Sequence, residues 1–94
     1  MLLAIRRGKA KNKTRVVTRP VFIVGGNRDC DMVLGDPQFA PMHFYLFHRN
    51  GATTLRCLSG FPEVTINGKR KRAASIHDGD RIRTGCYEFV FKAA

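Results

Sequence analysis

The chain has 94 residues, enough for one domain and too few for a catalytic domain together with a separate binding domain. Its net charge of +10 favours acidic partners, namely nucleic acid, an acidic or phosphorylated protein, or an anionic surface. The alternative is that the positive charge only keeps the protein soluble. No apolar run approaches the roughly 20 residues of a membrane span, and the apolar start is too short for a secretory signal. We therefore expect a cytoplasmic protein without a membrane partner.

The first 20 residues predict a lead-in hairpin. Residues 2–5 are apolar, residues 6–13 are basic with a turn at Gly8 and Asn12, and residues 14–19 alternate with β-branched side chains. Pro20 then precedes an apolar strand at residues 21–24 and a sharp turn at Gly25 and Gly26.

The remaining chain predicts further short strands separated by turn residues. Residues 43–48 carry large side chains on both faces, which is typical of a central strand or of a strand whose outer face is covered. Alternation in the last strand makes Tyr87, Phe89 and Phe91 core candidates. The other expected strands are residues 32–34, 53–58, 64–66, 69–72 and 81–84. With no helical periodicity, this pattern predicts an all-β antiparallel sandwich.

Three cysteines, Cys30, Cys57 and Cys86, are an odd number at wide spacings, which argues against a disulfide framework. No C-x-x-C pair is present to favour zinc. We expect the cysteines to be small buried hydrophobes and the protein to bind no metal and no cofactor.

Several of these turns and strands together resemble the forkhead-associated (FHA) domain. The matching positions are Phe22 to Gly25, Asp31 to Leu34, Asp36, Pro37, His43, Asn67, Gly68, Asp78, Gly79, Asp80, Ile82 and Gly85. The resemblance implies a sandwich of about eleven strands with the binding loops at one end. It also implies a single domain over residues 1–94, with residues 1–20 as lead-in strands and residues 21–92 as the FHA core.

Phosphothreonine recognition is the usual activity of the FHA family, and the chain departs from the family at the positions that carry it. Gly26 stands where the family has arginine, Ala40 where it has serine, and Pro41 where it has a second arginine. Residues 60–64 replace the Ser-x-Asn-Gly-Thr loop. Losing one charged and one hydroxyl contact to a phosphate costs about 3 to 5 kcal/mol. The resemblance therefore implies a divergent, phosphate-independent member.

The loop end is the predicted partner-binding surface, because it offers apolar side chains where relatives offer anion ligands. Its expected residues are Gly26, Asn27, Arg28, Phe39, Ala40, Pro41, Phe61, Pro62 and Asn67. The alternative is that Phe39 and Phe61 fold inward and plug the loops. The expected structural residues are Gly25, His43, Asp78, Gly79, Asp80 and Gly85, with Arg81 and Arg83 as ion-pair partners of the two aspartates.

We expect a non-enzymatic signalling or adaptor module that binds a protein, with its basic hairpins steering an acidic partner. One alternative is a phosphopeptide binder in which Arg28 or Arg70 replaces the missing arginine. A second is electrostatic nucleic-acid binding through the lysine-rich tips and residues 69–72. An enzyme is disfavoured, since no nucleophile and base form a recognisable arrangement.

Overall fold

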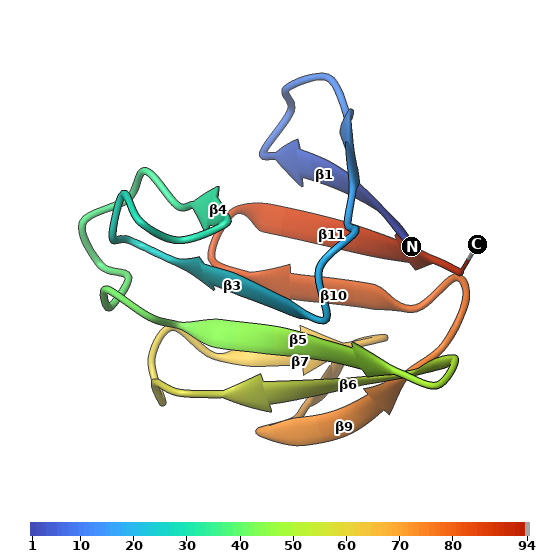
Figure 1. The fold of residues 1–94 in the computed structure, drawn as a ribbon. Coiled ribbons are helices and arrows are strands. Elements are labelled where there is room, and N and C mark those ends of the chain that lie inside the picture. The colour runs from blue at the N-terminus through green and yellow to red at the C-terminus, as the bar shows by residue number, and fades with distance from the viewer. Residues whose placement is uncertain (94) are drawn as a thin grey trace.

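The computed structural model describes residues 1–93 and contains eleven strands and no helix in that range (Figure 1). The strands are β1 (Leu2–Arg7), β2 (Lys13–Val16), β3 (Val21–Gly25), β4 (Met32–Val33), β5 (Phe44–Arg49), β6 (Ala52–Cys57), β7 (Val64–Ile66), β8 (Lys69–Arg70), β9 (Ala73–Ile76), β10 (Arg81–Thr84) and β11 (Tyr87–Lys92). This all-β architecture confirms the predicted fold class.

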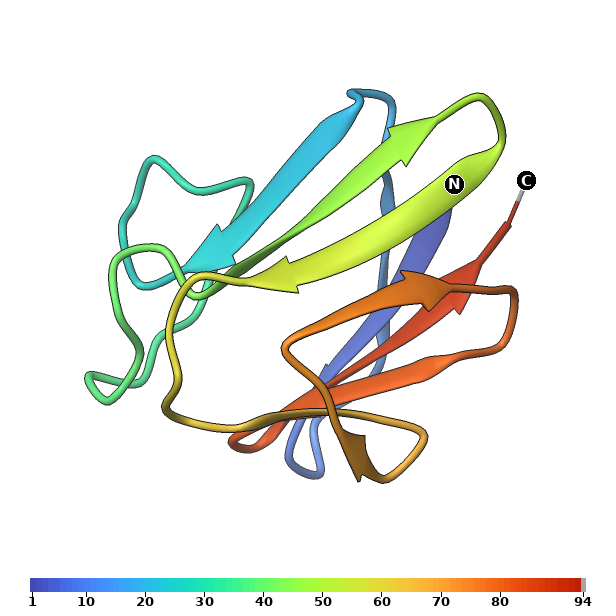
Figure 2. The same cartoon turned by 90° about the horizontal axis from the view of Figure 1, so that it is seen from below.

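Two sheets form the layers of the sandwich (Figure 2). The six-stranded sheet has the order β2-β1-β11-β10-β7-β8, and the five-stranded sheet has the order β4-β3-β5-β6-β9. Every strand pair is antiparallel, as expected, except the two-residue pairing of β3 with β4, which is parallel. The loop before β4 brings Asp31 back beside Ile23, where its carboxylate accepts the Ile23 N–H, and β4 then runs in the same direction as β3.

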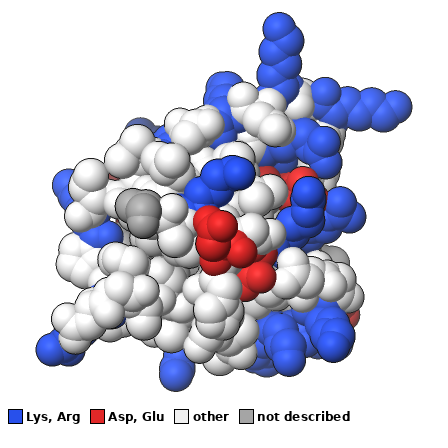
Figure 3. Space-filling model, turned by 90° about the vertical axis from the view of Figure 1, so that its right-hand side faces the viewer, with Lys and Arg blue, Asp and Glu red and all other residues white. Residues whose placement is uncertain are grey.

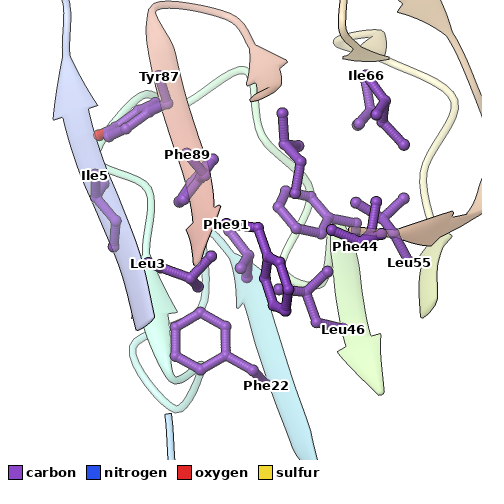
Figure 4. Packing of buried hydrophobic residues seen from close by; sticks show 14 of the residues in the cluster. Leu3, Ile5, Phe22, Phe44, Leu46, Leu55, Ile66, Tyr87, Phe89 and Phe91 are labelled. Carbon is purple, nitrogen blue, oxygen red and sulfur yellow. The ribbon is translucent and has the colours of Figure 1, made fainter. Parts of the chain in front are cut away.

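The core lies between the sheets and follows the period-two alternation of the strands. Tyr87, Phe89 and Phe91 are all buried, as predicted. Phe89 packs edge-on against Phe44 of the opposite sheet, with ring centroids 5.7 Å apart (Figure 4). β5 lies between β3 and β6, which confirms that residues 43–48 enter a central strand. Leu46 of β5 is fully buried and belongs to the same core.

β9 is a strand that the sequence analysis did not identify. Its sequence Ala-Ala-Ser-Ile contains one β-branched residue, and only Ile76 is buried. Pairing with β6, from Thr53↔Ile76 to Arg56↔Ala73, holds it in the sheet. β8, by contrast, has two residues and is shorter than the expected strand at residues 69–72.

The cysteines do not occupy the core, so their expected burial is wrong. Cys30 and Cys57 are half-buried and Cys86 is exposed. Each lies at a loop or strand end, where its thiol donates to an oxygen: Pro41 O for Cys30, Lys71 O for Cys57 and an Asp36 carboxylate oxygen for Cys86. Burial raises the pKa of the Cys30 and Cys57 thiols above the ordinary value.

Candidate partner-binding surface at the loop end

Two successive loops, one between β3 and β4 and the other between β4 and β5, meet at the end of the sandwich that lies at the left of Figure 1. The Gly26 N–H donates to Ala40 O at 2.9 Å, and the Asn27 N–H donates to Pro41 O at 3.1 Å. These bonds bring four of the predicted surface residues together. A Cβ on Gly25 would lie 2.3 Å from Pro41 O, so only glycine permits this close approach of the two backbones.

His43 joins this loop pair to the rest of the fold. Its backbone N–H donates to Val24 O at 2.9 Å, and its carbonyl accepts the N–H of Leu58 at 2.8 Å. The fully buried ring places Nε2 2.7 Å from the hydroxyl of Thr84 in β10. Its Nδ1 has no hydrogen-bond partner among the described residues, and burial lowers the pKa of His43 below its ordinary value. This geometry fits the structural role expected for His43.

Phe39 is 6% exposed, so the expectation that it contributes to an exposed surface is wrong. Its ring packs edge-on against His43 and Tyr87, with centroids 5.0 and 5.9 Å away. Gly85, at φ +57°, leaves the space that this ring fills, because a Cβ there would lie 2.8 Å from Phe39 Cζ. Phe39 therefore folds inward and fills the space between the loops, which is the alternative given for this residue in the sequence analysis.

Phe61 has the opposite placement, since 68% of it is exposed. Pro62 beside it is buried, so it anchors the loop and does not extend the exposed surface. Ser59 Oγ donates to Phe61 O at 2.9 Å and helps to hold the loop in its bend. Phe39 and Phe61, which were both expected in the same surface, thus have different roles.

The exposed apolar side chains at this end include two that the sequence analysis missed, Met42 and Leu58, each 47% exposed. Met42 precedes buried His43, and Leu58, whose N–H donates to His43 O, follows half-buried Cys57 at the end of β6. Alternation along each of these two segments was the signal that pointed to them. A neighbouring hollow of about 350 Å³ is lined by Gly26, Asn27, Val33, Leu34, Gly35, Asp36, Phe39 and Pro41. We call Pro41, Met42, Leu58 and Phe61 the loop-end patch.

Charged groups border the hollow. Arg7 Nη2 lies 2.6 Å from an Asp36 carboxylate oxygen, and this bond lowers the pKa of Asp36 below its usual value. The Tyr87 hydroxyl accepts the Gly35 N–H at 2.9 Å under the Arg7 guanidinium. Arg28 is exposed and forms no ion pair with residues 1–93.

Asn67 does not belong to this end, so its expected place in the surface is wrong. Its side chain accepts the Arg81 N–H at 3.0 Å and donates to Asp80 at 3.0 Å. Arg81 begins β10, whereas Thr84 beside His43 ends it. Asn67 thus fastens the turn at the far end of β10.

The Asp78–Gly79–Asp80 turn has the predicted structural form. Gly79 has φ +85°, Asp80 accepts the His77 N–H at 2.7 Å, and Asp78 accepts the Ala93 N–H at 2.9 Å. These bonds use the aspartates as backbone acceptors, as expected of turn-forming residues.

Arg81 and Arg83 do not pair with those aspartates, which corrects the expected ion pairs. They contact the Glu88 carboxylate at 3.3 and 2.7 Å, and Arg6 contacts it at 3.4 Å. All four side chains lie on the outer face of the six-stranded sheet, where the register aligns them. The bond from Arg83 lowers the pKa of Glu88. Figure 3 shows one face of the molecule, on which Lys and Arg side chains gather mostly at the right, the top and the bottom, with a group of Asp and Glu side chains at the centre.

Two classes of site are not seen in the described part of the chain. Within residues 1–93, no three His, Cys, Asp or Glu side chains gather closely enough to hold a metal ion. The same residues contain no helix whose length and apolar character would let it cross a membrane.

Solved structures share this fold. The chain is 20% identical to the FhaA FHA domain complexed with the intracellular domain of Rv3910, with a TM-score of 0.80 over 94% of this chain and 97% of that one. The FHA domain of CT664 protein from Chlamydia trachomatis is 16% identical, with a TM-score of 0.81 over 95% and 92%. Mycobacterium tuberculosis EmbR, in complex with a low-affinity phosphopeptide, is 20% identical, with a TM-score of 0.86 over 99% of this chain and 24% of EmbR.

No curated protein gives a significant match. A family model does match, over residues 4–94, and its description is the cytoplasmic domain of the inner membrane component of T3SS, the type III secretion system. That description confirms the predicted cytoplasmic location. The chain therefore belongs to the family of cytoplasmic domains of T3SS inner membrane components, and its fold is that of an FHA domain.

Proposed function

We propose that this chain is a non-enzymatic FHA-type module that binds another protein through the loop-end patch without requiring a phosphate. Residues 1–94 would form a single domain, with residues 1–20 supplying the lead-in strands. The observation that carries the proposal is Phe61, which is 68% exposed on the loop where the FHA family carries polar phosphate ligands. Large aromatic side chains are enriched among residues that dominate binding energy.

The geometry at Gly26 supports phosphate independence. Its N–H is already used by Ala40 O, and a Cβ would lie 3.0 Å from Phe39 O. A phosphate-gripping arginine at this position would require the Phe39–Ala40 backbone to move. Ala40 and Pro41, which stand at the other two contact positions, carry no side-chain donor.

The family membership suggests the class of partner, which is another cytoplasmic component of the same secretion system. The FhaA structure supports this choice, because an FHA domain there is complexed with an intracellular domain of another protein. The chain's net charge of +10 favours a partner with an acidic surface around its contact. Such steering would accelerate association and weaken with salt.

Calorimetric titration of the chain with each purified cytoplasmic component of its secretion system tests the proposal. Phe61→Ala should weaken the complex by more than about tenfold, since truncating a central aromatic contact costs at least about 1.4 kcal/mol. Thr54→Ala is the control, because Thr54 is exposed on β6 and lies outside the loop-end patch. Equal affinities for Phe61→Ala, Thr54→Ala and the unaltered chain would disprove the role of the patch.

A phosphopeptide site centred on Arg28 is the competing function, because Arg28 is an exposed cation beside the hollow with no ion pair among residues 1–93. Titration of phosphothreonine peptides and their unphosphorylated copies separates the two. Phosphate-dependent binding that Arg28→Ala abolishes would replace our proposal. Binding of duplex DNA that disappears as salt rises would instead favour the electrostatic nucleic-acid alternative.

A further inference from the structure

Both sheets have an open strand edge on the same side of the sandwich. β2 is the last strand of the six-stranded sheet, and β3 is covered by β4 only at Val24 and Gly25. The chain passes from β2 to β3 through residues 17–20, the blue segment that crosses between the sheets in Figure 1. An unpaired edge exposes backbone donors and acceptors that another strand can use.

The hydrogen-bond pattern identifies which groups on β2 are free. Met1 and Val17 exchange both backbone bonds, so they form a hydrogen-bonded pair. Since such pairs alternate along an antiparallel ladder, Val16 and Thr14 stand opposite Leu2 and Ala4 in non-hydrogen-bonded pairs. Their N–H and C=O groups therefore point away from β1, toward the open edge.

The same argument applies to β3 in its uncovered part. The His48 N–H donates to Pro20 O, so the next pair, Val21 and Phe47, is non-hydrogen-bonded. The backbone groups of Val21 then point away from β5. Ile23, two residues on, has its outward N–H bound by Asp31 at 2.7 Å, so the free backbone on β3 is limited to Val21.

A groove of about 250 Å³ runs along these two edges. Its lining is Arg15, Val16, Val17, Thr18, Arg19, Val21, Phe22 and Asp31. Arg15 closes its inner side, because its guanidinium lies over the Phe22 ring and donates to Asp31 O at 3.0 Å. The large apolar side chains that are exposed along the groove are Val16, at 65%, and Val21, at 39%.

The two faces of β2 differ in chemistry. Register places the Thr14 and Val16 side chains on the outer face beside half-buried Ala4 and Leu2. Lys13 and Arg15 lie on the other face, in line with Ile5 and Leu3. An added strand would continue this division, since directly opposite residues share a face. Its apolar residues would then adjoin Val16, and its acidic residues would adjoin Lys13 and Arg15.

Charge decides between a second copy and a different partner. Self-pairing of β2 would bring Lys13 and Arg15 of two chains together, each chain having a net charge of +10. Like charges directly opposite one another destabilise a strand pair. An acidic strand would instead meet complementary charges, including the exposed Arg19 at the rim of the groove.

We propose that the open edge of β2 binds an extended segment of a partner protein in which apolar and acidic residues alternate, so that the segment becomes a seventh strand of the six-stranded sheet. Main-chain bonds to Thr14 and Val16 would hold the segment, and Lys13, Arg15 and Arg19 would select its acidic residues. This surface is separate from the loop-end patch, because Val16 lies beside Leu2 at the far end of β1.

The probe is an acetylated, amidated peptide of alternating valine and glutamate, roughly six residues long, the usual length of a strand. Backbone amide NMR of the ¹⁵N-labelled chain should show saturable shifts centred on Thr14 and Val16, with slowed hydrogen exchange at both. A copy that is N-methylated at alternate residues loses the donors facing β2 and should bind at least about tenfold more weakly. A copy with lysine in place of glutamate should also bind at least tenfold more weakly.

Variants of the chain give the second arm. Val16→Pro removes an N–H that the β1 pairing does not use, so it should abolish binding while the other amide shifts stay in place. Val16→Thr keeps the donor and should retain binding, and Phe61→Ala should bind as the unaltered chain does. Equal binding of the N-methylated copy, or peptide-induced shifts centred on the loop-end patch, would overturn the proposal. So would shifts at Thr14 and Val16 that grow with protein concentration alone, because they would indicate self-pairing.

Discussion

The hydrogen bond between His43 and Thr84 should make a measurable contribution to stability, and Thr84→Val isolates it. Both side chains are buried, at 0% and 1% exposure, and His43 Nε2 lies 2.7 Å from Thr84 Oγ1. Valine has nearly the shape of threonine, so the substitution removes the hydroxyl without opening a cavity. Since His43 Nδ1 already has no partner in the described chain, the ring would then be left without any side-chain hydrogen bond.

The expected magnitude follows from that loss. A net hydrogen bond contributes about 0.5 to 1.5 kcal/mol, while a buried polar group left unpaired costs about 1 to 3 kcal/mol. We expect Thr84→Val to lower the free energy of unfolding by about 2 kcal/mol, because the imidazole cannot move to water without disturbing Phe39, which packs against it. Thr54→Val is the matched control, since Thr54 is exposed on β6.

Urea denaturation near neutral pH, followed by far-UV circular dichroism, measures both variants. The midpoint should fall for Thr84→Val at an unchanged slope, because the surface exposed on unfolding stays the same. If Thr84→Val were as stable as Thr54→Val, within about 0.5 kcal/mol, His43 would not depend on this bond. The structural role assigned to the pair would then be refuted.

Three further predictions test neighbouring features. Burial lowers the pKa of His43 below the unfolded value of 6.5, so the unfolded chain binds more protons than the folded one in this range. The free energy of unfolding should therefore fall as the pH drops below 6.5. Equal free energies of unfolding at pH 7 and pH 5.5 would contradict this. Glu88→Gln should lower the free energy of unfolding by about 1 kcal/mol at low salt and by less at high salt, because three partly exposed arginines lose their shared carboxylate. Glu63→Gln is the control and should change the stability little, because Glu63 forms an exposed pair with Arg70. Equal urea midpoints for the two variants would count against a stabilising role of the Glu88 cluster. Gly25→Ala should lower the free energy of unfolding by about 2 kcal/mol or more, because the added Cβ would lie 2.3 Å from the Pro41 carbonyl oxygen. Gly60→Ala, measured in the same urea assay, is the control, because only a flexible arginine side chain lies near that position.

Much of the fold was predictable because its signals are local. Period-two alternation identified Phe89 and its neighbours in the last strand as core residues, and the structure buries them. The Asp78–Gly79–Asp80 turn was predictable for the same reason, since a positive φ at Gly79 and aspartate acceptors beside it involve few residues. β9 was missed because pairing with β6 holds a segment whose own residues favour a strand only weakly.

The candidate site was predictable in its location but not in the direction of its side chains. The FHA-like pattern placed the loops of Gly26, Pro41 and Phe61 at one end, and the backbone bond from Gly26 to Ala40 joins two of them. Whether an aromatic residue in a loop faces the core or water depends on the space left by distant residues. Phe39 turns inward because Gly85 leaves room for its ring, and that vacancy exists only after β10 and β11 have paired.

The sequence by itself thus determined most of the strands and most of the turns, because each depends on residue type and near neighbours. Tertiary structure alone decided that Asn67 belongs to the far end of β10, that Arg81 and Arg83 share Glu88, and that the β2 edge is open. These outcomes depend on which strands lie side by side. Strand order is set by burial over the whole sandwich, and no local pattern encodes it.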